Sequence, residues 1–448
     1  MKIACLVSAT ITLVCMAPAS AQTTTTSLTA LRANNTSASD SFPGAFNDLP
    51  RPGNISPLPI TSLLPTGDKT RYIAHLMPWF TLSCNSATTK CGHVSVGYES
   101  NDASQVHKQI TDMHNRGFSV VFIDWYGPES AHHDGVVQKV MHEAERLKRD
   151  GVDFTFAVTP DKGIANAKCG MDKACNTQRL LAALLYAYKA YEQSPAYLHF
   201  NGRPVVPFFW SDSSHPVDWD EIHAKVPGNP LFVFQKAEGY KHEFSGGAYS
   251  WNGIKAPPDI GMAYLDDFYK ASATIDKSEQ IVVGSAYPGF DDRLASWGKA
   301  KIIIRRCGLT WLDTMKETLK YQQITGSALP YLQVITWNDY EEGTAMEMGI
   351  NNCVAAIPSS VQKGHLKWDV EFGKDSQGYT GSEETIAYFR IFTNVSGDKL
   401  QELKQVQTNA AHDLDLSPFH LTSGEKLYIQ AVGKSQILNH LSEPISVP

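Results

Sequence analysis

Apolar segments alternate regularly with amphipathic segments between residues 70 and 350. Each apolar segment is short and rich in β-branched or aromatic residues, as is typical of strands buried on both faces. Eight strands are predicted, at 72–79, 119–126, 153–159, 205–210, 231–235, 247–251, 281–287 and 331–339. Strands of this kind that are separated by helices indicate a parallel sheet covered by helices.

The intervening segments have the 3.6-residue periodicity of amphipathic helices. The clearest covers residues 134–151, where Asp134 is expected to cap the start and Gly151 to end the helix. Further helices are predicted at 103–116, 176–193, 218–225, 260–272 and 310–325. Eight units in about 280 residues predict an α/β fold of the (β/α)8 TIM-barrel type. A doubly wound open sheet is the alternative, but no glycine-rich phosphate turn follows the first strand.

The pattern changes after residue 355 to alternating apolar and polar positions with polar turns between them. Segments 364–372, 385–395, 414–419 and 426–434 show this alternation, which is typical of half-buried strands. A small all-β sandwich of the immunoglobulin or fibronectin type is therefore predicted at 355–448.

The N-terminal residues 1–21 contain a lysine, an apolar stretch and an A-x-A site, which predict a cleaved signal peptide and a secreted or periplasmic protein. A membrane anchor is the alternative, but the apolar run is shorter than the roughly 20 residues that a span needs. Residues 22–65 are rich in Thr, Ser and Pro and are expected to form a linker or a loosely attached arm before a barrel at 66–352.

Composition and charge narrow the class of protein. Apolar residues make up 42% of the chain, which is enough for a sizeable core. The formal net charge is −7 and no basic run is present, which argues against binding to nucleic acid or to anionic membranes. We expect a monomer without a membrane span.

Six cysteines remain once the signal peptide is removed, and export would allow them to form disulfides. The short spacings favour Cys84–Cys91 and Cys169–Cys175, which leaves Cys307–Cys353. A zinc site is the alternative, but the chain has no C-x-x-C spacing to support it.

Aromatic and acidic residues recur together where the predicted strands end. In a parallel barrel these ends form the active site. Aromatic rings pack on sugar rings, and carboxylates accept hydrogen bonds from hydroxyls. The combination therefore predicts a binding site for a polysaccharide or oligosaccharide. The candidate substrate-binding residues are His75, Trp79, His93, Asp124, Trp125, Tyr126, Asp161, Tyr287, Asp292, Trp337, Asn338 and Tyr340.

The last strand ends in "VITWNDYEEGT", where Asp339 and Glu342 are three residues apart. Their Cα atoms are at most about 11 Å apart, so a turn would let both carboxylates face one cavity. Mutual repulsion would then raise the pKa of one of them. A cluster that caps a following helix is the alternative. Glu341 is expected to point elsewhere.

The same stretch resembles the signature "WNDYGES" of glycoside hydrolase family 71, the α-1,3-glucanases, and is similar to "NEWHEGT" of family 99, the endo-α-mannosidases. Segments "AHLMPWF", "GFSVVFIDWYGP" and "AYPGFDDR" are similar to family 99 segments. The resemblance implies a (β/α)8 barrel and endo-hydrolysis of an α-linked glycan without a cofactor. Glu341 departs from both patterns, which have Gly or His there, and Ala345 and Met346 replace a polar tail.

We assign Glu342 as the general acid and Asp339 as the general base or substrate-assisting base, and the reverse assignment stays open. Resemblance to family 71 implies inversion through a water molecule, whereas resemblance to family 99 implies retention through the sugar 2-hydroxyl. Asp124 and Asp161 are candidates for binding hydroxyls or for orienting the acid.

Two other functions are alternatives to glycoside hydrolysis. A degenerate barrel could bind glycan without cleaving it, and a barrel enzyme of different chemistry, such as a metal-dependent deacetylase, is also open. The segment "SAHHDG" could hold a metal, but the rings of adjacent His132 and His133 cannot easily reach one ion. No G-x-S-x-G motif supports an esterase.

Overall fold

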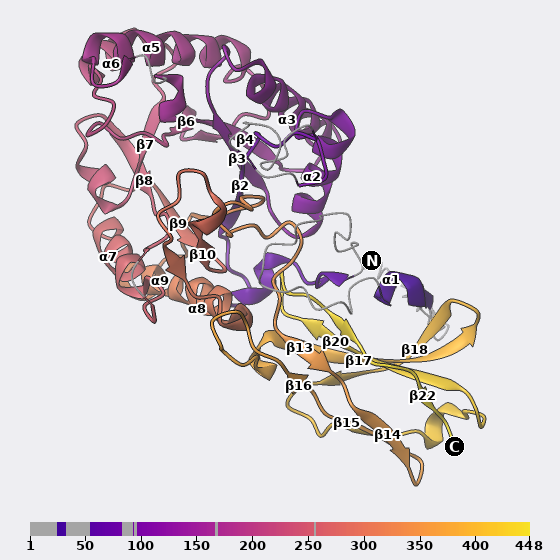
Figure 1. Cartoon of the computed structure of the whole chain (residues 1–448). Helices are drawn as coiled ribbons and strands as arrows, with labels where there is room; N and C mark the ends of the chain where they lie inside the picture. The colour runs from indigo at the N-terminus through magenta and orange to yellow at the C-terminus, as the bar shows by residue number, and fades with distance from the viewer. Residues whose placement is uncertain (1–24, 33–53, 83–92, 94–95, 166–168, 255–256) are drawn as a thin grey trace, which may run out of the picture.

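The computed structural model describes residues 25–32, 54–82, 93, 96–165, 169–254 and 257–448 (Figure 1). The predicted signal peptide at 1–21 lies outside the described residues. The fold is mixed α/β: a nine-stranded sheet covered by helices is followed by a region of smaller sheets.

The nine-stranded sheet contains all eight predicted strands and a short additional one. Its order is β4 (Thr155–Pro160), β3 (Val120–Trp125), β2 (Arg71–Leu76), β12 (Tyr331–Val334), β9 (Ile281–Ala286), β8 (Ser245–Tyr249), β7 (Leu231–Gln235), β6 (Arg203–Pro207) and β5 (His199–Phe200). Every neighbouring pair is parallel except β5–β6. The parallel sheet confirms the interpretation of the apolar segments.

Strands β4 and β6 are joined just beyond their ends. The Phe209 N–H donates to the Pro160 carbonyl at 3.0 Å, and the Lys162 N–H donates to the Phe209 carbonyl at 3.2 Å. Asp161 and Phe209 form an isolated parallel bridge. The sheet is therefore curled so that strands far apart in its order meet (Figure 1).

The last strand of the nine-stranded sheet along the chain is shorter than predicted, because β12 ends at Val334 rather than at residue 339. Beyond β12 the backbone is hydrogen-bonded to both neighbouring strands. The Ile335 N–H donates to the Ala286 carbonyl at 3.0 Å, and the Trp337 N–H donates to the backbone carbonyl of His75 at 2.7 Å. These contacts hold the "VITWNDYEEGT" segment between its two neighbouring strands.

Helices pack around the sheet at the predicted places. They are α2 (Ala103–Asn115), α3 (Ala131–Arg149), α5 (Lys173–Ala190), α6 (Trp219–Lys225), α7 (Met262–Ser272), α8 (Leu309–Glu317) and α9 (Leu319–Thr325). The single helix expected at 310–325 is therefore two. None of the described helices is both long and apolar enough to cross a bilayer.

The predicted cap of the long helix is wrong. Helix α3 begins at Ala131, so Asp134 lies inside its first turn. Its buried carboxylate instead accepts hydrogen bonds from the Trp125 indole N–H at 3.2 Å and the Tyr191 hydroxyl at 2.5 Å. A buried carboxylate needs such donors, and here they come from β3 and from the residue that follows α5, so the side chain turns inward instead of capping the helix.

The region after residue 355 consists of strands and short 3₁₀ turns in the described residues, as predicted. A six-stranded sheet contains β1 (Thr25–Ser27), β18 (Lys399–Gln407), β17 (Ile386–Ser396), β20 (Lys426–Gly433), β21 (His440–Leu441) and β22 (Ile445–Ser446). Smaller sheets contain β14 (Ser359–Gln362), β15 (His365–Trp368) and β19 (Asp413–Asp415), and β13 (Val354–Ala356) with β16 (Glu371–Phe372). Leu366, Phe389 and Ile429 belong to one apolar core that these sheets share.

The described parts of segment 22–65 pack against both regions. Strand β1 pairs antiparallel with β18, and α1 (Leu28–Arg32) follows it. Further on, Ile55 bridges to Leu438 and Ile60 is fully buried. This segment therefore contributes a strand to the C-terminal sheet and apolar side chains to the core.

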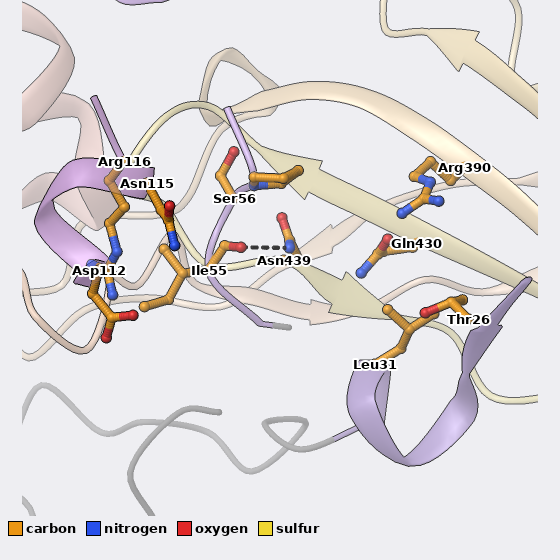
Figure 2. A pocket seen from close by; sticks show the side chains of 11 residues that line it. Thr26, Leu31, Ile55, Ser56, Asp112, Asn115, Arg116, Arg390, Gln430 and Asn439 are labelled. Atoms are coloured by element: carbon orange, nitrogen blue, oxygen red, sulfur yellow. Dashed lines mark hydrogen bonds between the residues drawn. The ribbon is translucent and has the colours of Figure 1, made fainter. Parts of the chain in front are cut away.

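A cavity of about 400 Å³ lies where the N-terminal segment, α2 and the C-terminal sheet meet (Figure 2). Across it, the Asn439 carboxamide donates to the Ile55 carbonyl at 3.1 Å. The Arg390 guanidinium on its wall is paired with Glu402, with Nε at 2.9 Å from Oε2. The Asn439 bond therefore ties the N-terminal segment to the C-terminal sheet at this cavity.

Two of the three predicted disulfides, Cys169–Cys175 and Cys307–Cys353, are confirmed. The third, Cys84–Cys91, lies outside the described residues. The Cys307–Cys353 bond joins the loop before α8 to the start of the C-terminal region, so it ties the two regions together.

Replacing both Cys307 and Cys353 by serine is expected to lower the free energy of unfolding by about 4 kcal/mol, because the lost cross-link closes a long loop. The matched Cys169/Cys175 double variant should lose about 2 kcal/mol, since its loop is much shorter. The sequence separations are 46 and 6 residues. Urea unfolding of both variants measures the difference, and an equal loss would contradict this ranking.

Candidate active site

The turn after β12 is organised by Asp339. Its Oδ1 accepts hydrogen bonds from the backbone N–H groups of Glu341 at 3.1 Å and Glu342 at 2.9 Å. Its own N–H donates to the Thr336 hydroxyl at 2.8 Å. No helix follows, since 340–349 form turns and irregular backbone. The carboxylate therefore fixes a turn, and the alternative of a helix-capping cluster is not the one that the structure adopts.

Asp339 and Glu342 lie within electrostatic reach of each other. Burial raises the pKa of Asp339 well above its usual value, and the charge of Glu342 raises it further. Burial also raises the pKa of Glu342, whose Oε1 accepts a hydrogen bond from the Trp297 indole N–H at 3.2 Å. Two acids in this situation favour a state in which one holds a proton beside an ionised partner.

Asp124 and Asp161 bring two further carboxyl groups to the same edge of the sheet. Asp124 on β3 lies opposite Thr159 on β4, and Asp161 follows directly after β4. Burial and the nearby charges of Asp161 and Asp339 raise the pKa of Asp124 well above its usual value. Burial raises the pKa of Asp161 to about 6, although the Gly163 N–H donates to its Oδ1 at 2.5 Å. These acids lie beside the pair at the turn.

A buried oxygen of Asp124, Oδ1, makes no hydrogen bond to the described residues. A buried polar atom of this kind is usually satisfied by a ligand or by water. The exposed Lys162 supplies positive charge nearby, which counteracts the raised pKa of Asp124, Asp161 and Glu342.

Aromatic rings form one wall beside these acids. Trp79 stacks on His93 with ring centres 5.0 Å apart and an interplanar angle of 15°. The ring centre of Tyr126 lies 6.5 Å from that of Trp79, and the ring of Trp297 is edge-on to that of Trp79 with ring centres 6.2 Å apart. Of the predicted sugar-contacting aromatics, Trp79, His93 and Tyr126 are thus brought together.

Glu341 lies on this same wall, contrary to the expectation that it points elsewhere. Its Oε2 is 2.9 Å from Nδ1 of His93, and its side chain is buried. The short turn set by Asp339 brings Glu341 close enough for its charge to contribute to the raised pKa of both Asp339 and Glu342.

His75 lies deeper on the inner face of the sheet. Burial lowers its pKa to about 4, so the ring is neutral at pH 7. Its Nδ1 is 3.3 Å from Oε1 of Gln333 on β12, and Trp251 meets the ring edge-on at 5.0 Å. His75 therefore lies in the floor of the acid-rich end rather than in the aromatic wall.

Several predicted substrate-binding aromatics instead pack in the core. Trp125 donates to Asp134 under α3, and the Tyr287 hydroxyl donates to the Ile260 carbonyl at 2.8 Å. Trp337 packs on Phe118, and the Tyr340 hydroxyl donates to Glu347 at 2.6 Å. Successive strand residues point to opposite faces, so Trp125, the neighbour of the inward Asp124 on β3, points outward to the helices.

The side chains of Asn338 and Asp292 are hydrogen-bonded to backbone groups. The Asn338 carboxamide accepts from the Met77 N–H at 2.8 Å and donates to the Met77 carbonyl at 2.9 Å. The Asp292 carboxylate accepts the Lys301 N–H at 2.6 Å and the Lys299 N–H at 3.0 Å. Both side chains therefore hold loops in place around the site.

Trp297 was missed by the sequence analysis. It lies in the loop between β10 (Phe290–Asp291) and β11 (Ile302–Ile303), beyond the strand end on which the prediction concentrated. A tryptophan flanked by polar and small residues in "ASWGKA" was the available signal, since such a position has little core to fill.

The described residues contain no group of three or more His, Cys, Asp or Glu arranged to hold a metal ion. In the "SAHHDG" segment, His132 Nε2 lies 2.9 Å from the Pro78 carbonyl oxygen, and His133 packs on Tyr126 with ring centres 4.5 Å apart. The two rings are therefore engaged with different partners.

Comparison with known proteins adds to this geometry. Residues 147–368 match the sequence model of glycosyl hydrolase family 71. The chain is a glycosidase that is similar to family 71 over this region. The match confirms the predicted resemblance, and it includes Asp161, Asp339 and Glu342 but not the residues from β2 and β3.

Solved structures similar to this glycosidase include a GH99 endo-alpha-mannosidase from Bacteroides thetaiotaomicron. The identity is 18%, the coverage is 62% of this chain and 87% of that chain, and the TM-score is 0.47. A Cellulomonas fimi endo-beta-1,4-mannanase double mutant has 10% identity, coverage of 84% and 94%, and a TM-score of 0.35. No curated protein matches the chain.

Proposed function

We propose that this glycosidase is secreted and cleaves an α-linked polysaccharide of the α-1,3-glucan or α-mannan type. The family match supports hydrolysis of a glycan. The observation that carries the proposal is the turn after β12, in which Asp339 Oδ1 accepts the Glu342 N–H at 2.9 Å and which brings both acids to the carboxyl edge of the sheet, next to an aromatic wall. Such a pair beside sugar-binding rings is the arrangement that glycoside hydrolysis requires.

In the proposed reaction, Glu342 donates a proton to the glycosidic oxygen as the bond to the anomeric carbon breaks. Asp339 removes a proton either from a water molecule that attacks that carbon or from the sugar 2-hydroxyl. The first route inverts and the second retains the anomeric configuration. In the first route water is consumed, Glu342 is left ionised and Asp339 protonated, and proton exchange with the solvent restores the starting state. In the second route the 2-oxygen bonds to the anomeric carbon as a 1,2-anhydrosugar. A water molecule that gives its proton to Glu342 then opens this ring while Asp339 returns its proton to the 2-oxygen, so both acids regain their starting states.

Other residues of the site would bind the substrate. Asp124 has a buried oxygen that makes no hydrogen bond within the described part of the chain and suits a sugar hydroxyl, and Asp161 lies beside it. Trp79 and Tyr126 offer ring faces for the C–H face of a sugar. His75 would contact the sugar from the floor of the site, and His93 would hold Trp79 in its stack.

The domain organisation, export and oligomeric state of the protein are also part of the proposal. We propose that the nine-stranded sheet is the closed barrel of a catalytic domain at 66–352, which the bonds between Phe209 and its two partners beyond β4 support. The sheets at 355–448 would form the immunoglobulin or fibronectin-like sandwich. We further propose cleavage of residues 1–21 on export and a monomeric mature protein, which N-terminal sequencing and light scattering would test.

The function is tested by incubating the mature protein with a panel of α-glucans and α-mannans and recording NMR spectra of the first product anomer. Release of reducing ends from one α-linked glycan is expected, with the anomer distinguishing inversion from retention. A protein that binds the oligosaccharides without cleaving any would support the glycan-binding alternative. Activity abolished by a chelator would favour the metal-dependent alternative.

Replacing Glu341 by Gln is expected to move both limbs of the pH–activity profile to lower pH. The charge of Glu341 contributes to the raised pKa of both Asp339 and Glu342, so its removal lowers both values. The ionised base would then form at lower pH, and the protonated acid would be lost at lower pH. Initial rates measured across a pH series check this, and unchanged limbs would contradict it.

A further inference from the structure

The segment from β10 to β11 forms a hairpin whose shape is fixed by one of its own side chains. The two strands pair antiparallel, with Phe290 opposite Ile303. Inside the connecting loop, the buried Asp292 carboxylate accepts two backbone N–H groups, from Lys299 and Lys301. Because these bonds close the loop from within, the bend that carries Trp297 has a defined conformation.

The base of this hairpin rests on the turn that carries Glu342. The Asp291 N–H donates to the Glu342 carbonyl at 2.8 Å, and the Arg305 guanidinium donates to the Gly343 carbonyl. Gly343 has φ +62°, and a Cβ there would lie 2.9 Å from Nη2 of Arg305. The positive φ favours glycine, and the end of the Arg305 side chain lies against this glycine, so the hairpin and the turn are in close contact.

The Trp297 side chain combines exposure with a specific polar contact. It is 45% exposed, although its indole N–H lies 3.2 Å from Oε1 of Glu342. Its ring is nearly perpendicular to those of Trp79 and His93, at 82° and 69°. A tryptophan that packed only for stability would bury more of its surface, whereas an exposed ring beside an acid offers a face to a ligand.

We propose that Trp297 is the positioning residue of Glu342 and that its exposed face contacts the sugar that leaves when the bond is cleaved. This inference rests on the proposed function, in which Glu342 is the general acid. With Oε1 held by the indole N–H, Oε2 is left to carry the proton to the glycosidic oxygen. When the C–O bond breaks, the leaving sugar keeps that oxygen and proton, and the indole N–H stabilises the new carboxylate.

Two variants separate the two parts of this proposal. Trp297→Phe keeps a ring but removes the N–H, and it should lower kcat about tenfold at unchanged KM, as loss of a charge-assisted hydrogen bond predicts. Its basic limb should move to higher pH, because the lost bond lowers the pKa of Glu342 in the wild type. Trp297→Ala should in addition raise KM several-fold, because the contact face is lost.

The matched control is Trp219→Phe. The Trp219 indole N–H also bonds to a carboxylate, Asp212, at 3.1 Å, but at the start of α6. This variant should keep the wild-type kcat and pH limits. In the Glu342→Gln background, Trp297→Phe should cause no further loss of kcat, since its effect passes through Glu342.

A readout without substrate distinguishes failure of this inference from failure of the proposed function. In ¹⁵N-labelled protein, the indole N–H resonance that disappears in Trp297→Phe should shift with pH, and Glu342→Gln should remove that shift. A resonance that titrates equally in both proteins, or a Trp297→Phe variant with normal kcat and basic limb, overturns the role of Trp297. A wild type that cleaves no α-glycan overturns the proposed function and with it the leaving-sugar contact.

Discussion

Replacing Glu342 by Gln is expected to lower kcat on the natural polysaccharide by about 10²–10⁴-fold, the range of a lost general acid. The amide retains the size of the side chain and can still accept the Trp297 N–H, but it cannot deliver a proton to the glycosidic oxygen. The loss should be much smaller on an α-glycosyl fluoride, because fluoride leaves without protonation. Comparing the two substrates therefore isolates proton donation from substrate binding.

The same variant should change the pH profile of the remaining activity. If Asp339 is the base, Glu342 still holds its proton where Asp339 ionises, so the acid limb on the fluoride substrate stays in place and the basic limb, which reports Glu342, is lost. If the roles are exchanged, the charge of Glu342 is one cause of the raised pKa of Asp339, so the amide lowers that pKa and the limb that reports Asp339 moves to lower pH. Glu221→Gln on α6, which removes a carboxylate paired with Lys225 at 2.7 Å, is the control and should behave as wild type. Full activity of Glu342→Gln on polysaccharide would refute the assignment.

The second large effect is expected for Asp339→Asn, with a loss in kcat of about 10²–10⁴-fold on both substrates. Here an activated leaving group gives no rescue, since the missing step is proton removal from water or from the 2-hydroxyl. The fold should persist, because an Asn oxygen can still accept the N–H groups of Glu341 and Glu342. Thermal unfolding and initial rates together check both expectations.

A matched carboxylate tests whether this loss reflects chemistry rather than a disturbed turn. Asp276 also accepts a backbone N–H from two residues further on, Ser278, at 2.9 Å, but it lies between α7 and β9. Asp276→Asn should leave kcat unchanged. Rescue of Asp339→Asn by the fluoride substrate would instead exchange the roles and make Asp339 the acid.

Much of this architecture follows from the pattern of the sequence. The eight strands were predictable because each is a short apolar run between periodic helices, and the last was the one most misjudged in length. The acid pair could be located because Asp339 and Glu342 are so near in sequence that any turn brings them together. Local signals of this kind are reliable where neighbouring residues decide the geometry.

The rest of the site depends on contacts between residues far apart in the chain. His93 and Glu341 are separated by 248 residues, and Trp297 and Glu342 by 45. The spacing of apolar and polar residues along the sequence does not indicate contacts between residues so far apart. The direction of a side chain at a strand end is equally hard to infer, so Asp124 and its neighbour Trp125 were both assigned to substrate although they face opposite sides of the sheet.

Strand β1 lies in the same sheet as the last strands of the chain, and its Ser27 hydroxyl bonds to Asp398, 371 residues later. During synthesis, β1 cannot pair with β18 until almost the whole polypeptide has left the ribosome. Removing it would uncover the backbone edge of β18, and exposed edges of this kind pair readily with other chains. Shortening the chain at its beginning is thus expected to promote self-association at its end.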